Sequence, residues 1–466
     1  MEKKKDYSLF KILCIPVLLY LVLTWIIPTG SFSGGEFVKG DITPLGLYGL
    51  FVSPVYSFAV FAQYIVLILC VGGFYGVLNK TGAYQKIVDF FASKNKVKFL
   101  IATVCIFALV TSLFGETMLV FILLPFFVSV LLKLGYDKVS SIAATVGATL
   151  IGTITSISGN MAIYKAYFSL DPKLFVLFNI IMLIVFVFLL CMLIISNNVK
   201  GGDNKKLETV KDIPLYESVK NNKKSVAPLI VILIITLLLI ILGSYNWYYS
   251  FGVEIFTNLH EKISSIELFG VAIFNRIFGD FSEIGYFSNY DLSAILLIAS
   301  VLIAWVYSVS LNDFIEGFKK GVKDMLLPGI YIVLASVVFS EVVTSSANIS
   351  LTISNYILNL SSNFNIFTGT LTGILGSLFY NDYLYFINGI SSIVSLYDAN
   401  MIPVVLNVFQ SMFGIMMFVL PVSMVLIGGL KYLNVSYKDW IKYIWKFLIQ
   451  IFVISLIGSI IFSMIV

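Results

Sequence analysis

The sequence has few charged residues and lacks the composition of a soluble enzyme. Asp, Glu, Lys and Arg make up 12% of the 466 residues, whereas 59% are hydrophobic and the mean hydropathy is +0.98. Soluble domains contain about 25% charged and about 45–50% apolar residues. The composition therefore excludes a soluble globular enzyme. Many apolar runs reach the roughly 20 residues that a helix needs to cross a bilayer, so we expect a polytopic membrane protein in contact with lipid.

Patterns for metal, disulfide and nucleotide chemistry are also missing. The four cysteines lie far apart, each inside an apolar run, and the chain has one His. No spacing fits a zinc site or a disulfide framework, and no Walker A, GxSxG, HExxH or GxGxxG motif is present. The net charge of +5 comes mainly from Lys beside the ends of apolar runs. We expect no enzyme, no resident metal or cofactor, and no nucleic-acid partner.

Two kinds of apolar segment are present. Residues 99–132 and 366–395 each hold two apolar halves of roughly 12–15 residues around a polar centre. Such halves are too short to span a bilayer, so we expect two re-entrant hairpins buried in protein. Full-length apolar runs, by contrast, predict nine spans, at 9–27, 54–78, 139–157, 174–195, 226–243, 291–308, 326–341, 402–427 and 444–464.

The distribution of charge sets the expected topology. Lys predominates in the loops 79–98, 197–225, 312–324 and 431–446, whereas the 244–291 loop has six acids against one Lys and one Arg. The positive-inside rule places the Lys-rich loops in the cytoplasm and the acidic loop outside. Nine spans and two hairpins satisfy every assignment, with a cytoplasmic N-terminus. The run to Ile27 after the first lysines lacks a signal-peptide cleavage site, so we interpret it as the first span.

The same plan predicts inverted-topology repeats, which are characteristic of secondary transporters. Each hairpin follows one span and precedes two. Ser112–Phe121 aligns with Ser377–Phe386, and five of the ten positions match. The expected all-α organisation comprises a first helix with an external loop (1–45), a first repeat (46–196), a cytoplasmic linker (197–225), connecting helices (226–325) and a second repeat (326–466).

Two acids lie at the hairpin centres, unlike the other acids of the chain. Glu116 and Asp382 fall near the expected membrane mid-depth, where an ionisable group costs at least about 2.5 kcal/mol on insertion scales. Such a residue is a candidate functional residue by default. The alternative is that each carboxylate only caps the broken backbone of its hairpin. The aligned and adjacent residues Ser112, Thr117, Ser377 and Asn381 are further candidates.

The span after each hairpin is interrupted by polar and small residues. Thr155 and Ser156 lie in the first, and Gln410 and Ser411 lie in the second, before Pro421. Such residues can unwind backbone and expose groups to an ion or substrate. The alternative is ordinary close packing of helices through small residues. Gln410 and Ser411 are the stronger candidate ligands because they are polar at depth.

Charge also limits the substrate. No Lys, Arg or His lies within the apolar part of any predicted span or hairpin. An anionic substrate would need helix N-termini, hydroxyls or co-transported cations. A substrate with an ammonium or guanidinium group would pair directly with Glu116 and Asp382. This favours a cationic or zwitterionic substrate, with Na⁺ or H⁺ as the candidate coupling ion.

Five short stretches of the sequence are similar to a known family: Trp25–Phe32, Gly72–Ala83, Phe114–Glu116, Leu134–Lys138 and Phe314–Met325. They resemble the YfcC-type family of basic amino acid antiporters. That family is related to the anaerobic C4-dicarboxylate carriers and the aminobenzoyl-glutamate transporters of the ion transporter superfamily. The resemblance implies two hairpins in inverted repeats, an elevator-like transport domain and a homodimer. Phe379–Asp382 and Gln410–Gly414 depart from the small-residue motifs of that family.

The sequence therefore predicts a multi-pass secondary transporter of a bacterial inner membrane. We expect it to move a basic or other small amino acid by exchange or ion-coupled symport. One alternative is a Na⁺- or H⁺-coupled carrier of C4-dicarboxylates or small peptides. An alternative from another class is a non-transporting membrane scaffold or receptor.

Overall fold

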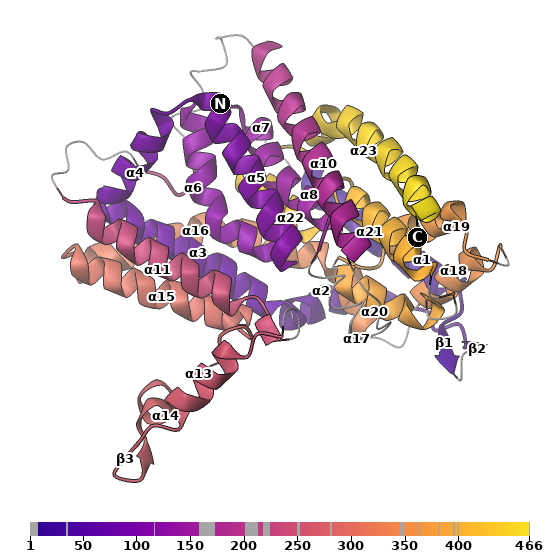
Figure 1. Cartoon of the computed structure of the whole chain (residues 1–466), viewed down its shortest axis with the longest axis horizontal. Helices are drawn as coiled ribbons and strands as arrows, with labels where there is room; N and C mark the ends of the chain where they lie inside the picture. The colour runs from indigo at the N-terminus through magenta and orange to yellow at the C-terminus, as the bar shows by residue number, and fades with distance from the viewer. Residues whose placement is uncertain are drawn as a thin grey trace. The chain divides into compact units, whose positions relative to one another are not determined.

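The protein is almost entirely helical, as the sequence predicts for an all-α polytopic membrane protein (Figure 1). Two short antiparallel hairpins, β1–β2 and β3–β4, are the β-structure of the described residues. The computed structural model describes residues 8–33, 36–115, 117–157, 173–200, 213–217, 224–248, 252–279, 282–344, 349–361, 363–381, 383–394, 397–398 and 400–465.

The chain forms two compact units. Unit 1 comprises Met1–Ile65, Ala92–Pro214 and Leu327–Val466, and unit 2 comprises Val66–Phe91 and Leu215–Leu326. Helix α3 (Ala62–Thr81) runs from unit 1 into unit 2, and α16 (Leu311–Ala335) runs from unit 2 into unit 1.

Unit 1 repeats one order of elements. A helical hairpin is followed by a broken span and then by a long helix. In the first half these are α5 (Lys96–Phe114), η1 (Thr117–Leu119) with α6 (Val120–Lys133), α7 (Lys138–Ile142), a π-helical turn (Ala143–Gly147), α8 (Ala148–Ile154) and α10 (Lys173–Lys200). In the second half these are α19 (Ile366–Gly376), α20 (Tyr383–Val394), α21 (Ile402–Met416), α22 (Met424–Tyr432) and α23 (Tyr437–Ile465).

Packing within unit 1 follows the same repeated order. Helix α8 packs on α5, α21 packs on α19, and α8 and α21 pack on each other. The two broken spans therefore meet at the centre of the unit. The remaining elements of unit 1 are α1 (Ser8–Thr24), β1 (Gly30–Ser33), β2 (Glu36–Lys39), α2 (Leu47–Val60), α17 (Val337–Thr344) and α18 (Ser350–Leu358).

Unit 2 is built on close helix packing. Gly72 and Gly76 of α3 face Gly317 and Gly321 of α16, and a Cβ added at Gly76 or Gly321 would lie well under 3.0 Å from a backbone oxygen of the other helix. Small residues four apart allow this approach of two backbones. The other helices of unit 2 are α4 (Ala83–Ala92), α11 (Ala227–Gly243) and α15 (Asn289–Val306), and α11 packs on α15.

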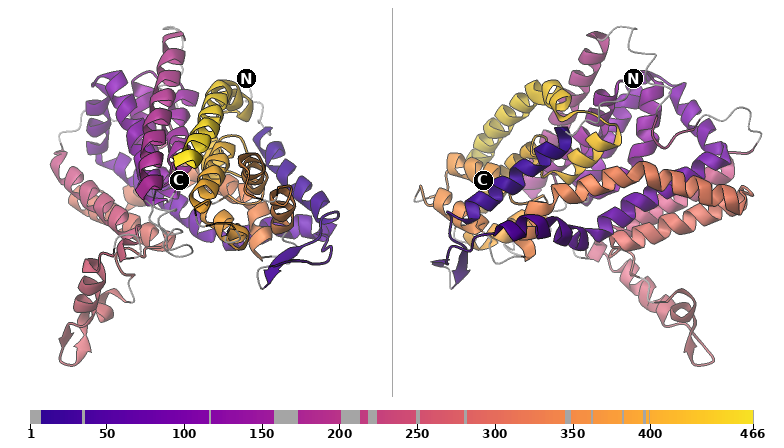
Figure 2. Two further views of the ribbon diagram at one scale, coloured as in Figure 1. Left: turned by 45° about the vertical axis from the view of Figure 1, so that its right-hand side comes forward. Right: turned by 180° about the vertical axis from the view of Figure 1, so that it is seen from behind.

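An arm extends from the α11–α15 pair of unit 2 (Figure 2). It consists of α13 (Ile255–Ser264), β3 (Glu267–Leu268), β4 (Val271–Ala272) and α14 (Ile273–Phe278). Phe269 and Gly270 form the turn between its strands, and both have positive φ. The acidic 244–291 loop is thus partly folded.

Five helices of the described residues are long and apolar enough to cross a membrane: α3, α5, α10, α15 and α23. The pair α16–α17, bent by 47° at Ser336, makes a sixth. Seven shorter apolar helices are present among these residues. The protein is therefore a multi-pass membrane protein, and the count of nine spans stays a prediction.

Three sequence-based boundaries were wrong. The 54–78 run is two helices that meet at Phe61. The 402–427 run, which the sequence predicts to be interrupted, is a second case of a broken run, with its break between Met416 and Met424. Pro421 explains the second break because proline donates no backbone hydrogen bond. The 312–324 segment is helix and not loop, because Ser310 and Asp313 cap the start of α16. Helix α5 has 19 residues, more than the predicted hairpin half.

Candidate substrate-binding site

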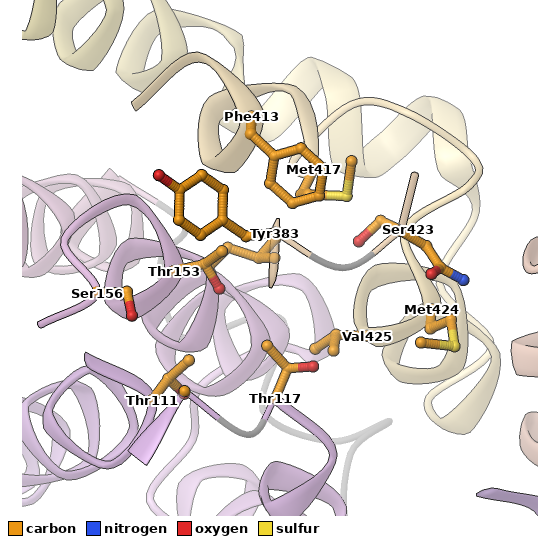
Figure 3. A pocket seen from close by; sticks show the side chains of 13 residues that line it. Thr111, Thr117, Thr153, Ser156, Tyr383, Phe413, Met417, Ser423, Met424 and Val425 are labelled. Atoms are coloured by element: carbon orange, nitrogen blue, oxygen red, sulfur yellow. The ribbon is translucent and has the colours of Figure 1, made fainter. Parts of the chain in front are cut away.

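A cavity lies at the centre of unit 1, between the two hairpin turns and the two broken spans (Figure 3). It contains about 560 Å³ of space free of atoms, including open solvent at its mouth. The lining residues are Thr111, Gly115, Thr117, Leu150, Thr153, Ser156, Asn381, Tyr383, Phe413, Met417, Ser423, Met424 and Val425.

The described lining combines hydroxyl groups with apolar side chains and carries no charged side chain. Five Ser and Thr hydroxyls line it together with the Asn381 amide. The Thr111 and Thr153 hydroxyls donate to carbonyls one turn earlier in their own helices, at 3.1 and 3.4 Å. A hydroxyl hydrogen rotates freely, so a ligand in the cavity can receive it without unfolding the helix.

The first hairpin turn reaches the cavity through Gly115. This residue has φ +74°, and its N–H donates to Thr111 O at 2.9 Å, which ends α5. A left-handed conformation at this position favours glycine. Gly115 and Thr117 both line the cavity. Glu116 lies outside the described residues.

The second hairpin turn is fastened to three neighbouring elements. Asn381 Nδ2 donates to Ser336 Oγ at 2.9 Å, at the bend between α16 and α17. The Tyr380 hydroxyl lies 2.9 Å from Ser350 Oγ of α18, and Tyr383 Oη donates to Leu406 O at 3.2 Å. These contacts position Asn381 and Tyr383 at the cavity. Asp382 lies outside the described residues.

The candidate residues from the sequence fall into three groups in the structure. Thr117, Ser156 and Asn381 line the cavity. Ser112 and Thr155 are buried beside it, and Ser112 Oγ donates to Thr155 O at 2.6 Å. Ser377, Gln410 and Ser411 are buried but do not line the cavity.

Several lining residues were not among the candidates from the sequence. Thr111, Thr153, Tyr383 and Ser423 belong to this group. Thr153 follows Gly152, whose backbone approaches Ala108 O of α5 so closely that a Cβ would not fit. Ser423 follows Pro421 by two residues and caps α22, with Leu426 N–H donating to its Oγ at 3.4 Å. In the sequence, a small residue or a proline close to a hydroxyl residue was therefore the pattern that could have identified Thr153 and Ser423 as lining residues.

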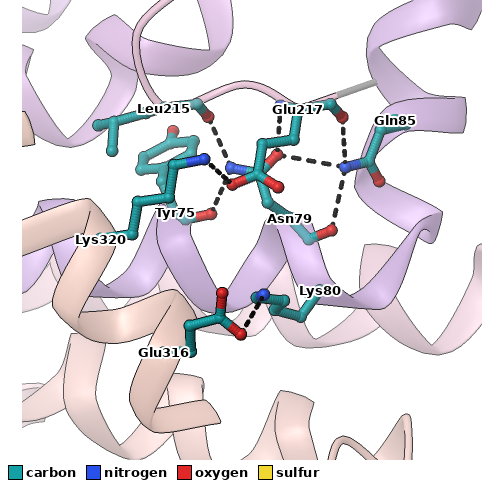
Figure 4. A network of polar contacts seen from close by, with 8 residues as sticks. All are labelled: Tyr75, Asn79, Lys80, Gln85, Leu215, Glu217, Glu316 and Lys320. Carbon is teal, nitrogen blue, oxygen red and sulfur yellow. Dashed lines mark hydrogen bonds and ion pairs between the residues drawn. The ribbon is translucent and has the colours of Figure 1, made fainter. Parts of the chain in front are cut away.

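A second polar cluster lies in unit 2 (Figure 4). Asn79 Nδ2 donates to Tyr75 O and Leu215 O, both at 2.9 Å, and its Oδ1 accepts from Glu217 N–H at 3.1 Å. Gln85 Nε2 donates to Glu217 O at 2.9 Å. Lys320 forms an ion pair with Glu217 at 2.7 Å, and Lys80 pairs with Glu316 at 3.1 Å.

This cluster also holds part of the segment that the sequence predicts as a linker. Within 197–225, Leu215 and Glu217 are held by side chains of α3, α4 and α16. Leu215 is buried despite its positive φ of 55°. The end of the linker is thus part of unit 2.

The fold and the cavity together define a class of protein. A multi-pass helical protein with two hairpins and two broken spans around a small central cavity has the features of a secondary transporter. Among the described residues, no group of three His, Cys, Asp or Glu side chains could hold a metal ion.

Comparison with known proteins gives the family. Residues 55–464 match the family model described as DcuC: C4-dicarboxylate anaerobic carrier. This match covers most of the chain, and the protein belongs to that family. It is a carrier of a small molecule.

The fold search finds similarity to the Alcanivorax borkumensis YdaH transporter, solved by crystallography. The identity is 14% and the TM-score 0.42, and the match covers 98% of this chain and 97% of that one. A comparison with curated proteins finds no match.

Proposed function

We propose that the protein is a secondary carrier that moves a small C4-dicarboxylate across the membrane through the cavity of unit 1. The family description supports this substrate over the basic amino acids that we expected from the sequence. The finer YfcC-type resemblance stays a prediction.

The observation that carries the proposal is the hydroxyl lining of the cavity. A carboxylate only accepts hydrogen bonds, so its site must supply donors. Thr111, Thr117, Thr153, Ser156 and Ser423 each bring one hydroxyl donor to the cavity. Apolar residues such as Phe413 and Met417 suit the carbon chain between two carboxylates.

The start of α22 adds a second source of donors. Met424 and Val425, its first two residues, line the cavity directly after the Ser423 cap. The first N–H groups of a helix have no intrahelical acceptor, and the helix dipole favours an anion there. This end of the cavity therefore suits one carboxylate of the substrate.

The role of Glu116 and Asp382 follows from the charge of the substrate. Their sequence neighbours Gly115, Thr117, Asn381 and Tyr383 line the cavity. Carboxylates close to a dianion would repel it unless protons or cations accompany it. We propose that these two acids bind the coupling H⁺ or Na⁺, in place of the cationic substrate group expected from the sequence.

The remaining proposals concern the setting of the carrier. The lysine-rich segments support a cytoplasmic N-terminus in a bacterial inner membrane. A homodimer stays a prediction of the resemblance. Single cysteines placed in the 244–291 and 197–225 loops, probed with an impermeant thiol reagent on intact cells, would test this orientation.

Counterflow in proteoliposomes tests the substrate. Vesicles preloaded with unlabelled succinate should accumulate labelled succinate, and vesicles preloaded with lysine should not accumulate labelled lysine. Accumulation of lysine alone would overturn the dicarboxylate proposal and restore pairing of a cationic substrate with Glu116 and Asp382. Accumulation of neither by verifiably folded protein would leave the scaffold alternative.

A further inference from the structure

The break after α8 is held from two sides by side-chain donors. Gln410 Nε2 of α21 donates to Ile154 O, the last carbonyl of α8, at 2.7 Å. On the other side, Ser112 Oγ donates to Thr155 O at 2.6 Å, and Ile157 N–H donates to Ser112 O at 2.8 Å. The terminal carbonyls Ile154 O and Thr155 O thus each receive a side-chain donor.

Close backbone packing reinforces both contacts. A Cβ at Gly152 would lie 2.5 Å from Ala108 O of α5, and a Cβ at Gly414 would lie 2.8 Å from the Ile154 backbone. The last turn of α8 therefore has α5 against one face and α21 against the other. Neither neighbour leaves space for a side chain at these glycines.

The break after α21 is built in the same way. Trp440 Nε1 of α23 donates to Phe418 O at 2.8 Å, and Tyr437 Oη donates to Val419 O. Trp440 is fully buried, and its ring stacks on Phe418. In both halves of unit 1, two successive carbonyls at the end of a broken span are thus occupied by side chains.

The cavity receives hydroxyls from the same segments. Thr153 and Ser156 flank the capped pair Ile154–Thr155, and both line the cavity. In the second half, Met417 precedes the capped pair Phe418–Val419, Ser423 follows it by four residues, and both line the cavity too. An uncapped helix end presents carbonyl oxygens that coordinate cations, whereas these breaks present hydroxyl donors.

We propose that Gln410 is a positioning residue of the carrier, which holds the last turn of α8 so that the Thr153 and Ser156 hydroxyls face the substrate. By capping Ile154 O, its amide also removes that carbonyl from cation coordination. The transport test of this inference rests on the proposed dicarboxylate function. The hydrogen-exchange test of the α8 end does not.

The geometry assigns the donor function to Gln410. Its side chain is fully buried, and Nε2 donates to Ile154 O and, at 3.3 Å, to Asn179 Oδ1. Oε1 has no hydrogen-bond partner among the described residues. Asn179 is fixed in turn by its bond to Phe175 O at 2.9 Å. Gln410 therefore acts here through its amide hydrogens, and not as the ligand that the sequence favours.

Two variants separate the donor role from a ligand role. Gln410→Met keeps the length but cannot donate. Gln410→Glu keeps the oxygen and donates only when protonated. The matched control is Ser459→Ala, which removes a 2.9 Å bond to Asn407 on the same helix, α21, away from the break.

Succinate counterflow and amide hydrogen exchange of residues 150–157 provide two readouts. Gln410→Met should raise KM about two- to tenfold with little change in maximal rate, and should accelerate exchange in that segment. With transport and exchange expressed relative to wild type at the same pH, both readouts of Gln410→Glu should return toward the wild-type values as the pH falls from 8 to 6. A folded packing variant would keep the same ratio to wild type at each pH. Ser459→Ala should change neither readout.

The outcomes separate this inference from the substrate proposal. If wild type does not carry succinate but Gln410→Met accelerates exchange at 150–157, the substrate is wrong and the positioning role stands. The positioning role is overturned if Gln410→Glu lowers the Na⁺ concentration needed for half-maximal transport at every pH, because Gln410 would then act as a cation ligand. It is also overturned if Gln410→Met changes neither readout. Should Gln410→Met fail to fold, Ser112→Ala removes the donor on the other side and should give the same two changes.

Discussion

The cavity of unit 1 and the polar cluster of unit 2 both contain uncharged polar side chains, and the cluster adds two ion pairs, but the two sites use their polar groups differently. In unit 2, the Asn79 and Gln85 amides bind the backbone of Leu215 and Glu217, and two glycine pairs bring α3 and α16 into backbone contact. In unit 1, Thr111 and Thr153 line a cavity, and their hydroxyls donate to carbonyls of their own helices.

The difference shows what each unit is suited for. Hydrogen bonds within the unit 2 cluster make it rigid, because each buried polar group is costly to release. In unit 1, a hydroxyl can donate its hydrogen either to a carbonyl of its own helix or to a ligand. Such hydroxyls allow unit 1 to bind a substrate and release it again. Four predictions can break or sharpen this contrast, from the largest expected effect to the smallest.

The largest effect is expected at the glycine contact of unit 2. Gly76→Ala places a Cβ against Gly317 O, which is backbone and cannot move aside alone. We expect a loss of at least about 3 kcal/mol of stability, since overpacking against backbone has no inexpensive relaxation. Thermal unfolding in detergent measures it. Gly46→Ala, with nothing within 4 Å of the new Cβ, is the control, and an equal shift in both would refute the backbone contact.

The next effect concerns the fixed end of the linker. Asn79→Leu removes the side chain that binds Tyr75 O, Leu215 O and Glu217 N–H. Leaving buried groups unpaired should lower the unfolding free energy by about 2–3 kcal/mol. The melting temperature measures this loss, and Asn258→Leu at an exposed position of the arm is the control. A melting temperature unchanged by Asn79→Leu would mean that the linker end is not held in solution.

A cavity hydroxyl should affect transport more than stability. Thr153→Val removes one lining hydroxyl at nearly constant volume and should raise the KM for succinate about tenfold, or about 1.4 kcal/mol. Thr103→Val removes a hydroxyl that bonds Phe99 O at 2.8 Å on α5, away from the cavity. Counterflow kinetics of both variants give the test. An equal KM change in the two would remove Thr153 from the site.

The smallest effect is expected for an exposed ion pair. Lys80 and Glu316 lie 3.1 Å apart, but the Glu316 side chain is 71% exposed. A double-mutant cycle of Lys80→Ala and Glu316→Ala should give a coupling energy below about 1 kcal/mol. A larger value would mean that this pair, and not only the glycine contact, holds α3 to α16.

The sequence predicts the second hairpin and the break before α22 well because their causes are local. The second hairpin was expected at 366–395, and helices occupy 366–376 and 383–394. Pro421 marks the break in the last broken span, since proline cannot continue the hydrogen-bond pattern. By contrast, the apolar run across Phe61 gives no sign of its break, because hydropathy does not depend on backbone angles.

The lining of the cavity depends on contacts that a single sequence does not contain. Thr111 and Ser423 come from segments more than 300 positions apart, and only tertiary packing brings them to one cavity. Gln410 was expected as a ligand because it is polar at depth, yet its amide caps Ile154 O. A buried amide can bind either a ligand or backbone, and the partner is decided by the neighbouring helix.

The cap on α8 also has a consequence for biogenesis. Residue 410 follows residue 154 by 256 positions, so the ribosome adds Gln410 long after α8 is made. At about 5–20 residues per second, this interval is on the order of 10–50 s. During that time the Ile154 carbonyl lacks its glutamine donor, and the last turn of α8 cannot reach its final packing. The first repeat therefore matures only when the second has been synthesised and inserted.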